Sequence, residues 1–270
     1  MVFYMEDIIF EEFDVLEINK EADRYTLTNV SKKVISEISL RIIVDDFELA
    51  SLLCLNQCQE KLAIGFLFTE GVINSFDDIQ TIYYNERMLA VIIKLQEGII
   101  IDKRETLRSV TTGCGKCVTY INSLKQGKFV DLEVGATFSV ETILQKMKSF
   151  VRSSEIFKTV GGVHSVLFST PEYELLNEDI GRHNCFDKIS GILLKERKLD
   201  LTSKGLIFVS GRISSEIVTK VIRLGVPVIV SRSTPTTSAV RLAKQFHVTL
   251  LGYVRDDKGY IYSCPERITV

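Results

Sequence analysis

Long apolar runs and a basic leader are both missing from this sequence of 270 residues. No stretch of about 18 apolar residues is present, so we expect no membrane-spanning helix and no membrane partner. The acidic start, MVFYMEDIIFEEFD, lacks the basic head of a secretory signal, and we expect a cytoplasmic protein. Lysine and arginine (33) nearly balance aspartate and glutamate (35), so no overall basic charge attracts nucleic acid. The composition, 46 % hydrophobic and 25 % charged, is that of a globular protein rather than a disordered one.

Several catalytic signatures are absent as well. Neither a Walker lysine motif nor a GxGxxG sequence occurs, so neither a nucleoside triphosphatase nor a dinucleotide dehydrogenase is indicated. A zinc-dependent deaminase would carry H-x-E followed by P-C-x-x-C, whereas Ser165 and Val166 follow His164. No second C-x-x-C accompanies the one at Cys114 and Cys117, so a structural zinc site is not supported either. We therefore expect no bound metal and no catalytic zinc.

The first half of the chain has the pattern of strands around one helix. Runs rich in β-branched and apolar residues, separated by polar breaks, predict the strands. They cover 8–18, 23–30, 37–44, 78–84, 88–95 and 98–102. The predicted helix covers 56–69, and Gly71 stands where a helix C-terminus favours a left-handed residue. A loop of small residues at 109–118 indicates a domain boundary, between a strand-rich N-terminal domain (1–108) and a larger domain (109–270).

Strands and helices alternate in the second half. Predicted helices cover 139–154, 183–197, 213–225 and 234–246, and predicted strands cover 160–168, 205–210, 226–231 and 248–254. Short, very apolar strands that alternate with helices indicate βαβ units, a parallel sheet and a mixed α/β fold class. The right-handed crossover rule then places the two strand-to-helix turns of the last third at one edge of that sheet.

The two strand-to-helix turns carry the groups that an anion needs. The first contains Gly211 and Arg212, and the second contains Ser231, Arg232, Ser233 and Thr234. Ligands of open α/β sheets bind at the carboxyl ends of the strands, and the helix N-termini that follow favour negative charge. Two arginines and several hydroxyl groups in these turns predict a site for phosphate or diphosphate. The alternative is that the Ser, Thr and Gly residues only cap helices and shape turns.

Two cysteines, Cys114 and Cys117, form a C-x-x-C within a loop of small residues. Lys116, between them, favours the thiolate, which is the form that attacks a sulfur electrophile. A thiol-disulfide oxidoreductase uses this spacing, and a sulfur carrier needs one thiol to hold a persulfide and a neighbour to assist or resolve it. We interpret the other four cysteines as small core residues. They are Cys54 and Cys58, near the predicted helix start, and Cys185 and Cys264.

The densest polar run in the chain is NEDIGRHNCFDK (177–188), at the start of a predicted helix. It places two carboxylates, Arg182, His183 and an asparagine close together in the sequence. Because His183 and Asp187 are four residues apart on the helix, a carboxylate–imidazole contact is expected. With His164 in the same domain, these residues predict a polar active-site cluster. The alternative is a helix cap with one surface ion pair.

Several motifs together resemble the formate dehydrogenase accessory sulfurtransferase family, FdhD. They are EKLAIGFLFTEGVI, CGKC, GGVHSVLF, EDIGRHNCFDKISG, SGRISSEIVTKVIRLGVPVIVSRSTPTTSAVRLAK and TLLGYV. The resemblance implies a cytoplasmic sulfurtransferase that accepts persulfide sulfur from a cysteine desulfurase. It would pass this sulfur to the molybdenum (or tungsten) bis-guanine-dinucleotide cofactor of formate dehydrogenase. The resemblance also implies a homodimer and a cytidine-deaminase-like three-layer domain without zinc, beside the smaller N-terminal domain.

The resemblance also assigns residues. The family's persulfide cysteine corresponds to Cys114, with Cys117 as its partner. Its cofactor-binding segment falls on Tyr253, Val254, Arg255, Asp256, Asp257 and Lys258. The paired aspartates of this segment are unexpected beside a diphosphate. With the strand-end turns, Arg182 and the two histidines, the segment forms the predicted cofactor site, where GDP should act as a mimic. The alternative is that the segment is only a charged hairpin turn.

The sequence leaves two other functions open. One is a C-x-x-C thiol-disulfide oxidoreductase, because the same pair of thiols can cycle between dithiol and disulfide. The other is a non-catalytic chaperone that only holds the guanine-dinucleotide cofactor. Of the three functions, the sulfurtransferase agrees with the motifs taken together, and it is the function that the sequence predicts.

Overall fold

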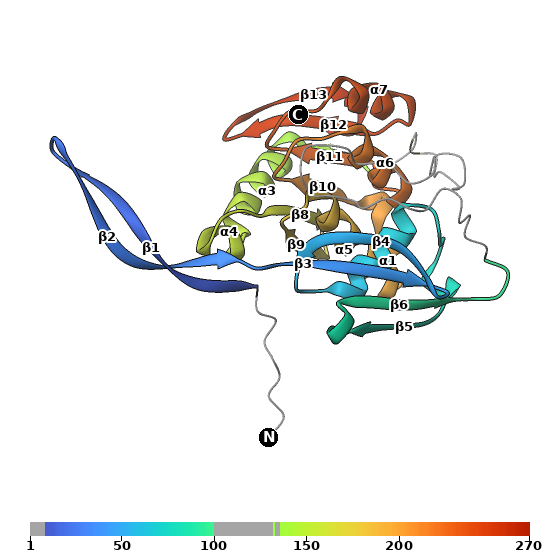
Figure 1. The fold of residues 1–270 in the computed structure, drawn as a ribbon. Coiled ribbons are helices and arrows are strands. Elements are labelled where there is room, and N and C mark those ends of the chain that lie inside the picture. Colours follow the sequence, from blue (N-terminus) through green and yellow to red (C-terminus); the bar gives the residue numbers. More distant parts are fainter. Residues whose placement is uncertain (1–8, 100–131, 133–135) are drawn as a thin grey trace.

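The computed structural model describes residues 9–99, 132 and 136–270 (Figure 1). Two larger β-sheets lie on either side of a layer of helices, and a long β-hairpin extends away from them. This arrangement confirms the mixed α/β fold class that the sequence predicts. None of the described helices is long and apolar enough to cross a membrane.

Six strands form the larger sheet, in the order β13-β12-β11-β10-β8-β9. They are β8 (His164–Ser169), β9 (Glu174–Asp179), β10 (Leu206–Val209), β11 (Val228–Ser231), β12 (Thr249–Arg255) and β13 (Lys258–Ser263). β10, β11 and β12 are parallel, as the βαβ pattern predicts, whereas β8, β9 and β13 join by antiparallel pairing. The sequence predicts no strand at β9, because its polar residues resemble the start of a helix.

Helices cover both faces of this sheet. α5 (Arg182–Lys195), α6 (Ser215–Leu224) and α7 (Thr237–Gln245) lie on one face, and α3 (Val140–Ser153) with α4 (Glu155–Thr159) lies on the other. The alternation of side chains along β10 shows the two faces. Ile207 and Val209 belong to the core beneath α5 and α6, while Leu206 and Phe208 pack against α3. Because both faces are buried, the strand is a continuous apolar run, and the domain has three layers.

The N-terminal part supplies a second sheet, of four strands in the order β4-β3-β6-β5. They are β3 (Glu37–Val44), β4 (Phe47–Leu55), β5 (Ile79–Asn85) and β6 (Ala90–Leu95). The sequence does not predict β4, because its residues include no Val, Ile or Thr. β4 forms because Asp45 and Asp46, both with positive φ (47° and 64°), turn the chain into a hairpin with β3. The predicted strand 98–102 is wrong at Gly98, which lies in a turn, and its part from residue 100 lies outside the described residues.

Helix α1 (Gln59–Thr69) packs between the two sheets and meets α5 at backbone distance. A Cβ atom on Gly65 of α1 would lie 1.6 Å from the carbonyl oxygen of Asp187. A Cβ atom on Gly191 of α5 would lie 1.9 Å from the carbonyl oxygen of Lys61. Only glycine allows the two helix backbones to approach this closely, and the contact holds the N-terminal sheet against the larger domain.

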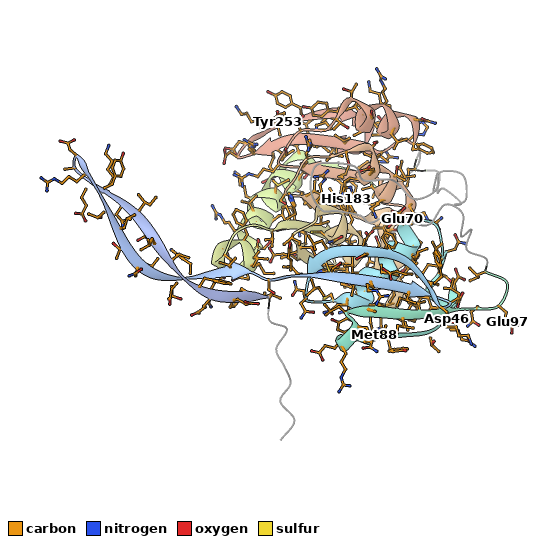
Figure 2. The ribbon with its side chains drawn as sticks, viewed as in Figure 1. Asp46, Glu70, Met88, Glu97, His183 and Tyr253 are labelled. Atoms are coloured by element: carbon orange, nitrogen blue, oxygen red, sulfur yellow. The ribbon has the colours of Figure 1, made fainter. Side chains whose placement is uncertain are left out.

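A β-hairpin of β1 (Phe10–Glu21) and β2 (Arg24–Ile35) forms a sheet of its own, with no other described strand beside it. It confirms the first two predicted strands and extends them. Its side chains project into solvent along its length (Figure 2). Four large apolar side chains near its tip are between 58 % and 71 % exposed: Leu16, Ile18, Tyr25 and Leu27.

The two halves of the chain share one hydrophobic core. Leu40 of β3 and Phe186 of α5 belong to the same cluster of buried side chains. The predicted domain boundary (109–118) lies outside the described residues, so the division into two domains at that point stays a prediction.

Short elements complete the described fold. β7 (Phe138–Ser139) pairs with β14 (Ile268–Thr269), which ties the start of α3 to the end of the chain. The 3-10 segments are η1 (Phe76–Asp78), η2 (Glu86–Met88), η4 (Leu199–Lys204) and η5 (Pro265–Arg267). Gly71 (φ 79°) follows α1 in the left-handed conformation, as the sequence predicts.

Candidate functional site

The carboxyl ends of β10, β11 and β12 meet at one edge of the six-stranded sheet, as the crossover rule predicts. β8 runs in the opposite direction, so its first residue, His164, lies at the same edge. β9 ends there as well, because Asp179 pairs with His164, and α5 then begins with Arg182 and His183. The fold thus brings the two predicted turns, both histidines and Arg182 together. We call this edge the carboxyl edge; it comprises residues 163–165, 179–183, 210–214, 231–236 and 252–258.

The two strand-to-helix turns are joined by hydrogen bonds. Ser231 Oγ donates to the carbonyl oxygen of Gly211 (2.7 Å) and accepts from the N–H of Ser233 (2.9 Å). The N–H of Ile213 donates to the carbonyl oxygen of Thr234 (3.2 Å). The fully buried hydroxyl of Ser231 is therefore engaged in shaping the turns. This leaves the arginine side chains as the groups that face outward.

Unmet hydrogen-bond donors remain at the carboxyl edge. Arg212 and Arg232 are exposed, and neither forms an ion pair with a residue that the structure describes. Arg182 Nε and Ser214 Oγ are buried, and they have no hydrogen-bond partner within the described ranges. Buried polar atoms in folded proteins are nearly always paired with protein, water or ligand. These groups fit an anion with several acceptor oxygens, such as a diphosphate.

The segment from Tyr253 to Lys258 contains the turn of the β12–β13 hairpin, and the backbones of Arg255 and Lys258 are strand partners there. Tyr253 has a left-handed backbone (φ 52°), a ring that is 42 % exposed, and an N–H that donates to the carbonyl oxygen of Ser233 (2.9 Å). The Arg255 guanidinium lies 5.7 Å from the centre of the Tyr253 ring. Residues other than glycine in this conformation are strained, and such strain is common at functional sites. The hairpin is confirmed, and the cofactor-binding role of the segment stays a prediction.

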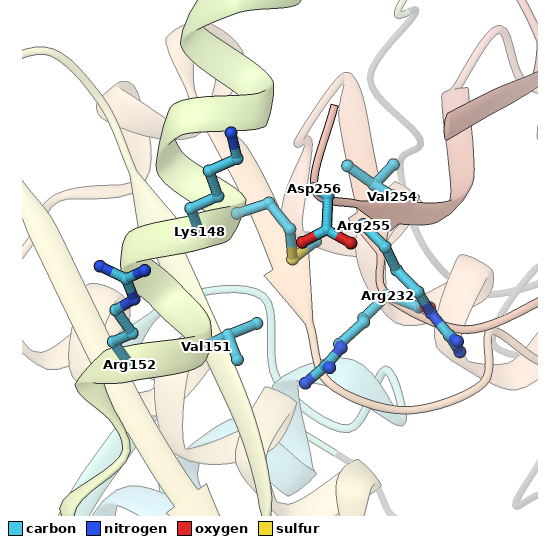
Figure 3. A pocket seen from close by; sticks show the side chains of 8 residues that line it. Lys148, Val151, Arg152, Arg232, Val254, Arg255 and Asp256 are labelled. Carbon is cyan, nitrogen blue, oxygen red and sulfur yellow. The ribbon is translucent and has the colours of Figure 1, made fainter. Parts of the chain in front are cut away.

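A cationic groove runs between α3 and the carboxyl edge (Figure 3). Its first pocket is lined by Met147, Lys148, Val151, Arg152, Arg232, Val254, Arg255 and Asp256. Its second pocket is lined by Phe150, Val151, Ser154, Phe157, Val163, His164, Ser165, Ser210 and Arg232. Arg232 lines both pockets, so they adjoin. The first pocket combines Lys148 and Arg152 of α3 with two arginines of the carboxyl edge. This concentration of positive charge suits an anionic ligand.

Sequence reasoning misses the contribution of α3. Lys148 and Arg152 follow Met147 and Val151 of its apolar stripe, so they stand at the border between its buried and exposed sides. Only the packing of α3 across the sheet brings them near the carboxyl edge. Their spacing of four residues, which puts them on one face of the helix, was the signal that the sequence offered.

The predicted contact between His183 and Asp187 is wrong. His183 Nε2 lies 3.1 Å from Glu216 Oε2, and this hydrogen bond holds the pKa of Glu216 below its ordinary value. Asp187 pairs instead with Lys220, at 2.6 Å. The physical reason is that α6 packs beside α5 and offers each of the two side chains another partner: Glu216 for the His183 ring and Lys220 for the Asp187 carboxylate.

The carboxylates of the polar run stabilise the fold. Asp179 is fully buried, forms an ion pair with Lys188 (2.7 Å) and accepts from the N–H of Gly181 (3.1 Å). Glu178 accepts hydrogen bonds from hydroxyl groups inside the fold. The predicted polar cluster is therefore smaller at the carboxyl edge, where His164 joins the first residues of α5. Burial, and then the charges of α5, lower the pKa of His164.

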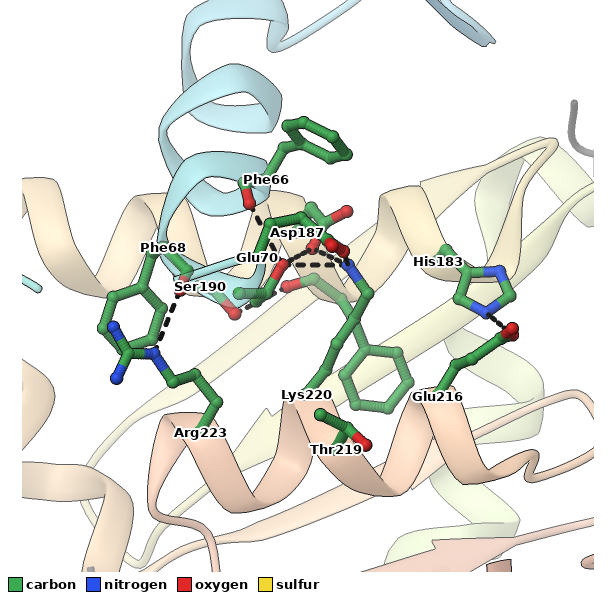
Figure 4. A network of polar contacts seen from close by, with 12 residues as sticks. Phe66, Phe68, Glu70, His183, Asp187, Ser190, Glu216, Thr219, Lys220 and Arg223 are labelled. Carbon is green, nitrogen blue, oxygen red and sulfur yellow. Dashed lines mark hydrogen bonds and ion pairs between the residues drawn. The ribbon is translucent and has the colours of Figure 1, made fainter. Parts of the chain in front are cut away.

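A buried polar network connects α1, α5 and α6 (Figure 4). Lys220 Nζ lies 2.6 Å from Asp187 Oδ1, 2.8 Å from Thr69 Oγ1 and 3.5 Å from Glu70 Oε1. Two carboxyl groups thus share one ammonium group, and Asp187 is the closer of the two. Burial therefore dominates at Glu70 and raises the pKa of its carboxyl group to about 7.

Replacing Glu70 by glutamine should stabilise the protein, relative to the parent, increasingly as the pH rises from about 5 to about 8. The pKa of Glu70 in the folded state, about 7, lies above its ordinary value of 4.5. The stability that Glu70 contributes is therefore complete below its ordinary pKa and is lost as the pH rises through the folded pKa. Glutamine resembles the protonated carboxyl group at every pH.

Urea unfolding across this pH range measures the effect, as the difference in unfolding free energy between the two proteins. Glu172→Gln, which changes an exposed carboxylate, should differ from the parent by an amount that does not vary with pH. A Glu70→Gln difference that is equally independent of pH would contradict the raised pKa.

The cysteines of the C-x-x-C loop (114–117) lie outside the described residues. Of the other four, Cys54 and Cys185 are buried as the sequence predicts, and burial raises the pKa of the Cys54 thiol to about 12. Cys54 lies in β4 rather than at a helix start. Cys58 and Cys264 are only partly buried, which corrects their interpretation as core residues. Both stand at the end of a loop, beside the first turn of a helical segment.

Comparison with known proteins adds sequence relatives over most of the chain. The FdhD/NarQ family model matches residues 35–269. The chain is 32 % identical over 246 residues to "Sulfur carrier protein FdhD" of Bacillus subtilis (strain 168), covering 90 % of this chain and 92 % of that protein. It is 35 % identical over 247 residues to the protein of the same name from Staphylococcus haemolyticus, with the same two coverages, 90 % and 92 %. For the Sulfolobus acidocaldarius protein of that name, the identity is 32 % over 259 residues, and the coverages are 94 % and 97 %.

A solved structure has the same fold. It is the crystal structure of a proposed formate dehydrogenase accessory protein from Desulfotalea psychrophila, with a TM-score of 0.73. The match covers 97 % of this chain and 100 % of that chain at 21 % sequence identity, and at this identity it supports the fold alone. The sequence relatives carry the assignment further, because they exceed 30 % identity over nine tenths of the chain and the family pattern extends from β2 to β14. By these matches, the chain belongs to the FdhD/NarQ family.

Proposed function

We propose that this chain is a sulfur carrier that delivers persulfide sulfur to a molybdenum (or tungsten) bis-guanine-dinucleotide cofactor. The relatives reported above are named sulfur carrier proteins, and the related structure is described as a formate dehydrogenase accessory protein. The proposal includes a cysteine desulfurase as the sulfur donor and formate dehydrogenase as the client. It also includes a homodimer as the working form, in the cytoplasm.

The observation that carries this proposal is the set of unmet donors at the carboxyl edge. Arg212 and Arg232 are exposed and unpaired among the described residues, and Arg182 Nε is buried without a partner in the same ranges. The N-termini of α6 and α7 follow the two turns directly, and their free N–H groups favour an anion. A dinucleotide cofactor carries diphosphate groups, whose oxygens accept hydrogen bonds from such donors.

The sulfur step is assigned to Cys114. Its thiolate would attack the outer sulfur atom of the donor's persulfide, so that a new S–S bond forms and the donor's cysteine leaves as a thiolate. Attack by the Cys117 thiolate on Cys114 Sγ would then break this bond, release sulfide for the cofactor and leave a Cys114–Cys117 disulfide. The cysteine pair thus supplies the two electrons that convert the sulfur to sulfide. A cellular dithiol must reduce the disulfide before the next cycle.

Incubation with a cysteine desulfurase and cysteine, followed by measurement of the intact mass, tests the sulfur-carrier function. The proposal predicts that Cys117→Ala, which keeps the accepting thiol and lacks the resolving one, becomes heavier by one sulfur atom, and that a dithiol reductant removes the addition. The parent should go on to the disulfide and release sulfide. A thiol-disulfide oxidoreductase would form the disulfide without releasing sulfide, and a chaperone that only holds the cofactor would take up no sulfur. Either of the last two results would contradict the proposal.

Replacing Arg232 by alanine should weaken GDP binding by about ten- to a hundred-fold, which is the effect of losing one charge-assisted hydrogen bond. Arg212→Ala should weaken it similarly, because both arginines lie at the turns before helix N-termini. Arg197→Ala is the matched control, because this exposed arginine pairs with Asp77 away from the carboxyl edge. Calorimetric titration with GDP compares the variants. If Arg232→Ala binds GDP as tightly as the parent, Arg232 is not part of the site.

A further inference from the structure

Asp256 places a carboxylate among the cations of the groove. A diphosphate ligand would be repelled by this carboxylate, so phosphate binding does not explain why an acidic residue stands here. We propose that Asp256 recognises the guanine base of a bound guanine nucleotide, by accepting hydrogen bonds from the N1–H and the N2 amino group of the ring. The inference rests on the proposed function, because it concerns the same ligand. It names the residue that selects guanine over adenine.

The two neighbouring aspartates have different surroundings. Asp257 forms an ion pair with Lys148 of α3 at 2.6 Å, so its charge is already compensated at the rim of the groove. Asp256 lines the first pocket and has no ion-pair partner in the described part of the chain. Figure 3 shows the Asp256 carboxylate directed into the pocket, between Lys148 and Arg232. Only Asp256 is therefore placed to contact a ligand in this pocket.

The turn of the β12–β13 hairpin determines the direction of this carboxylate. The backbones of Arg255 and Lys258 are strand partners on the two sides of the turn. Between them, Asp256 has a left-handed backbone (φ 52°), which aspartate adopts more readily than most residues. The neighbouring guanidinium is also held, because Arg255 Nε donates to the carbonyl oxygen of Arg232 (2.9 Å). Two consecutive residues of one short turn thus carry a guanidinium group and a carboxylate.

Guanine complements a pocket of this composition. Its ring has donors at N1 and N2 on one side and acceptors at O6 and N7 on the other. A carboxylate can accept two parallel hydrogen bonds, and arginine donates readily to O6 and N7. Val151, which is 38 % exposed, supplies an apolar surface for the face of the ring, and the buried side chains of Met147 and Val254 also line this pocket. Adenine has an acceptor at N1 and no amino group at C2, so its ring would set a lone pair against the carboxylate.

The charge of Asp256 separates base recognition from phosphate binding. A carboxylate in a cationic pocket repels phosphate, so a site that only bound phosphate would hold its ligand more tightly without Asp256. Base recognition has the opposite sign, because guanine loses two hydrogen bonds to a charged acceptor when Asp256 is removed. The same substitution should therefore change the affinities for GDP and ADP in opposite directions.

Calorimetric titration of the parent and of Asp256→Asn with GDP, ADP and xanthosine diphosphate tests the inference. The parent should bind GDP more tightly than ADP. In Asp256→Asn, GDP binding should weaken by about ten- to a hundred-fold, while ADP should bind as tightly as before or more tightly. Xanthosine diphosphate should bind the variant more tightly than the parent, because xanthine has a carbonyl group at C2 to which the new amide can donate.

Asp77→Asn is the matched control, because it removes an exposed carboxylate that pairs with Arg197 away from the groove. It should leave all three affinities unchanged, and ADP binding by Asp256→Asn shows that the variant keeps its fold. A preference for GDP that persists in Asp256→Asn, an equal loss of GDP and ADP, or a parent without preference would overturn the role of Asp256. In each of these cases, GDP binding by the parent leaves the proposed cofactor site standing. A parent that binds neither nucleotide would overturn both.

Discussion

An alanine at Cys114 is expected to leave formate dehydrogenase inactive in cells, while the protein itself stays folded and abundant. Cys114 is the thiol to which the proposal assigns the incoming sulfur. Buried thiols cannot replace it, because Cys54 and Cys185 lie in the core and burial raises their pKa values, which keeps them protonated. Formate dehydrogenase activity in cells that carry the variant as their only copy, together with the amount of the protein, measures the effect.

Two further variants make this result specific. Cys264→Ala removes a partly exposed thiol whose pKa is raised by burial, and it should leave client activity unchanged. Cys117→Ala should be as severe as Cys114→Ala, because the proposed step needs the Cys117 thiolate to release the sulfur as sulfide; a mild effect would show that another thiol can take this role. Client activity that survives in Cys114→Ala would remove this cysteine from the sulfur step.

The second large effect is expected at the contact between α1 and α5. Gly191→Ala should lower the free energy of unfolding by about 3 kcal/mol or more, because the new methyl group would meet a backbone atom that cannot rotate away. The added Cβ would lie 1.9 Å from the carbonyl oxygen of Lys61, so the two helices must move apart. Urea unfolding of the two proteins measures the difference.

Gln145→Ala is the control for Gly191→Ala, because it also introduces alanine into a helix but at an exposed position of α3. A surface change of this kind should alter the unfolding free energy by no more than about 0.5 kcal/mol. If Gly191→Ala were as stable as this control, the close approach of the two helix backbones would be contradicted.

The parts of the fold that the sequence predicts correctly are those with strong local signals. The strands at 205–210, 226–231 and 248–254 are apolar on both faces, and their helices carry clear apolar stripes. β4 and β9 escape prediction for opposite reasons. β4 is apolar but contains no β-branched residue. β9 ends in polar residues, and the fold accommodates its last one, Asp179, by an ion pair with Lys188. Both become strands through pairing with a neighbour, which local sequence does not encode.

The candidate site divides in the same way. The crossover rule places the two turns at one edge, because that follows from topology alone. His164 reaches this edge because β8 pairs antiparallel with β10, and the sequence does not show which strand β8 will pair with. The cations of α3 depend on packing across the sheet, and the partner of His183 is Glu216 from another helix rather than Asp187 from its own. Spacing along one helix could not reveal that choice of partner.

Hydrogen exchange of the backbone amides, with and without GDP, tests most directly whether the carboxyl edge is the cofactor site. If the cofactor binds here, exchange should become slower in three segments that are distant in the sequence and meet at this edge: 210–214, 231–236 and 252–258. Exchange in the hairpin of β1 and β2 should not change, because the hairpin extends away from the body (Figure 1). Protection confined to other segments, or no protection at a high GDP concentration, would contradict the account.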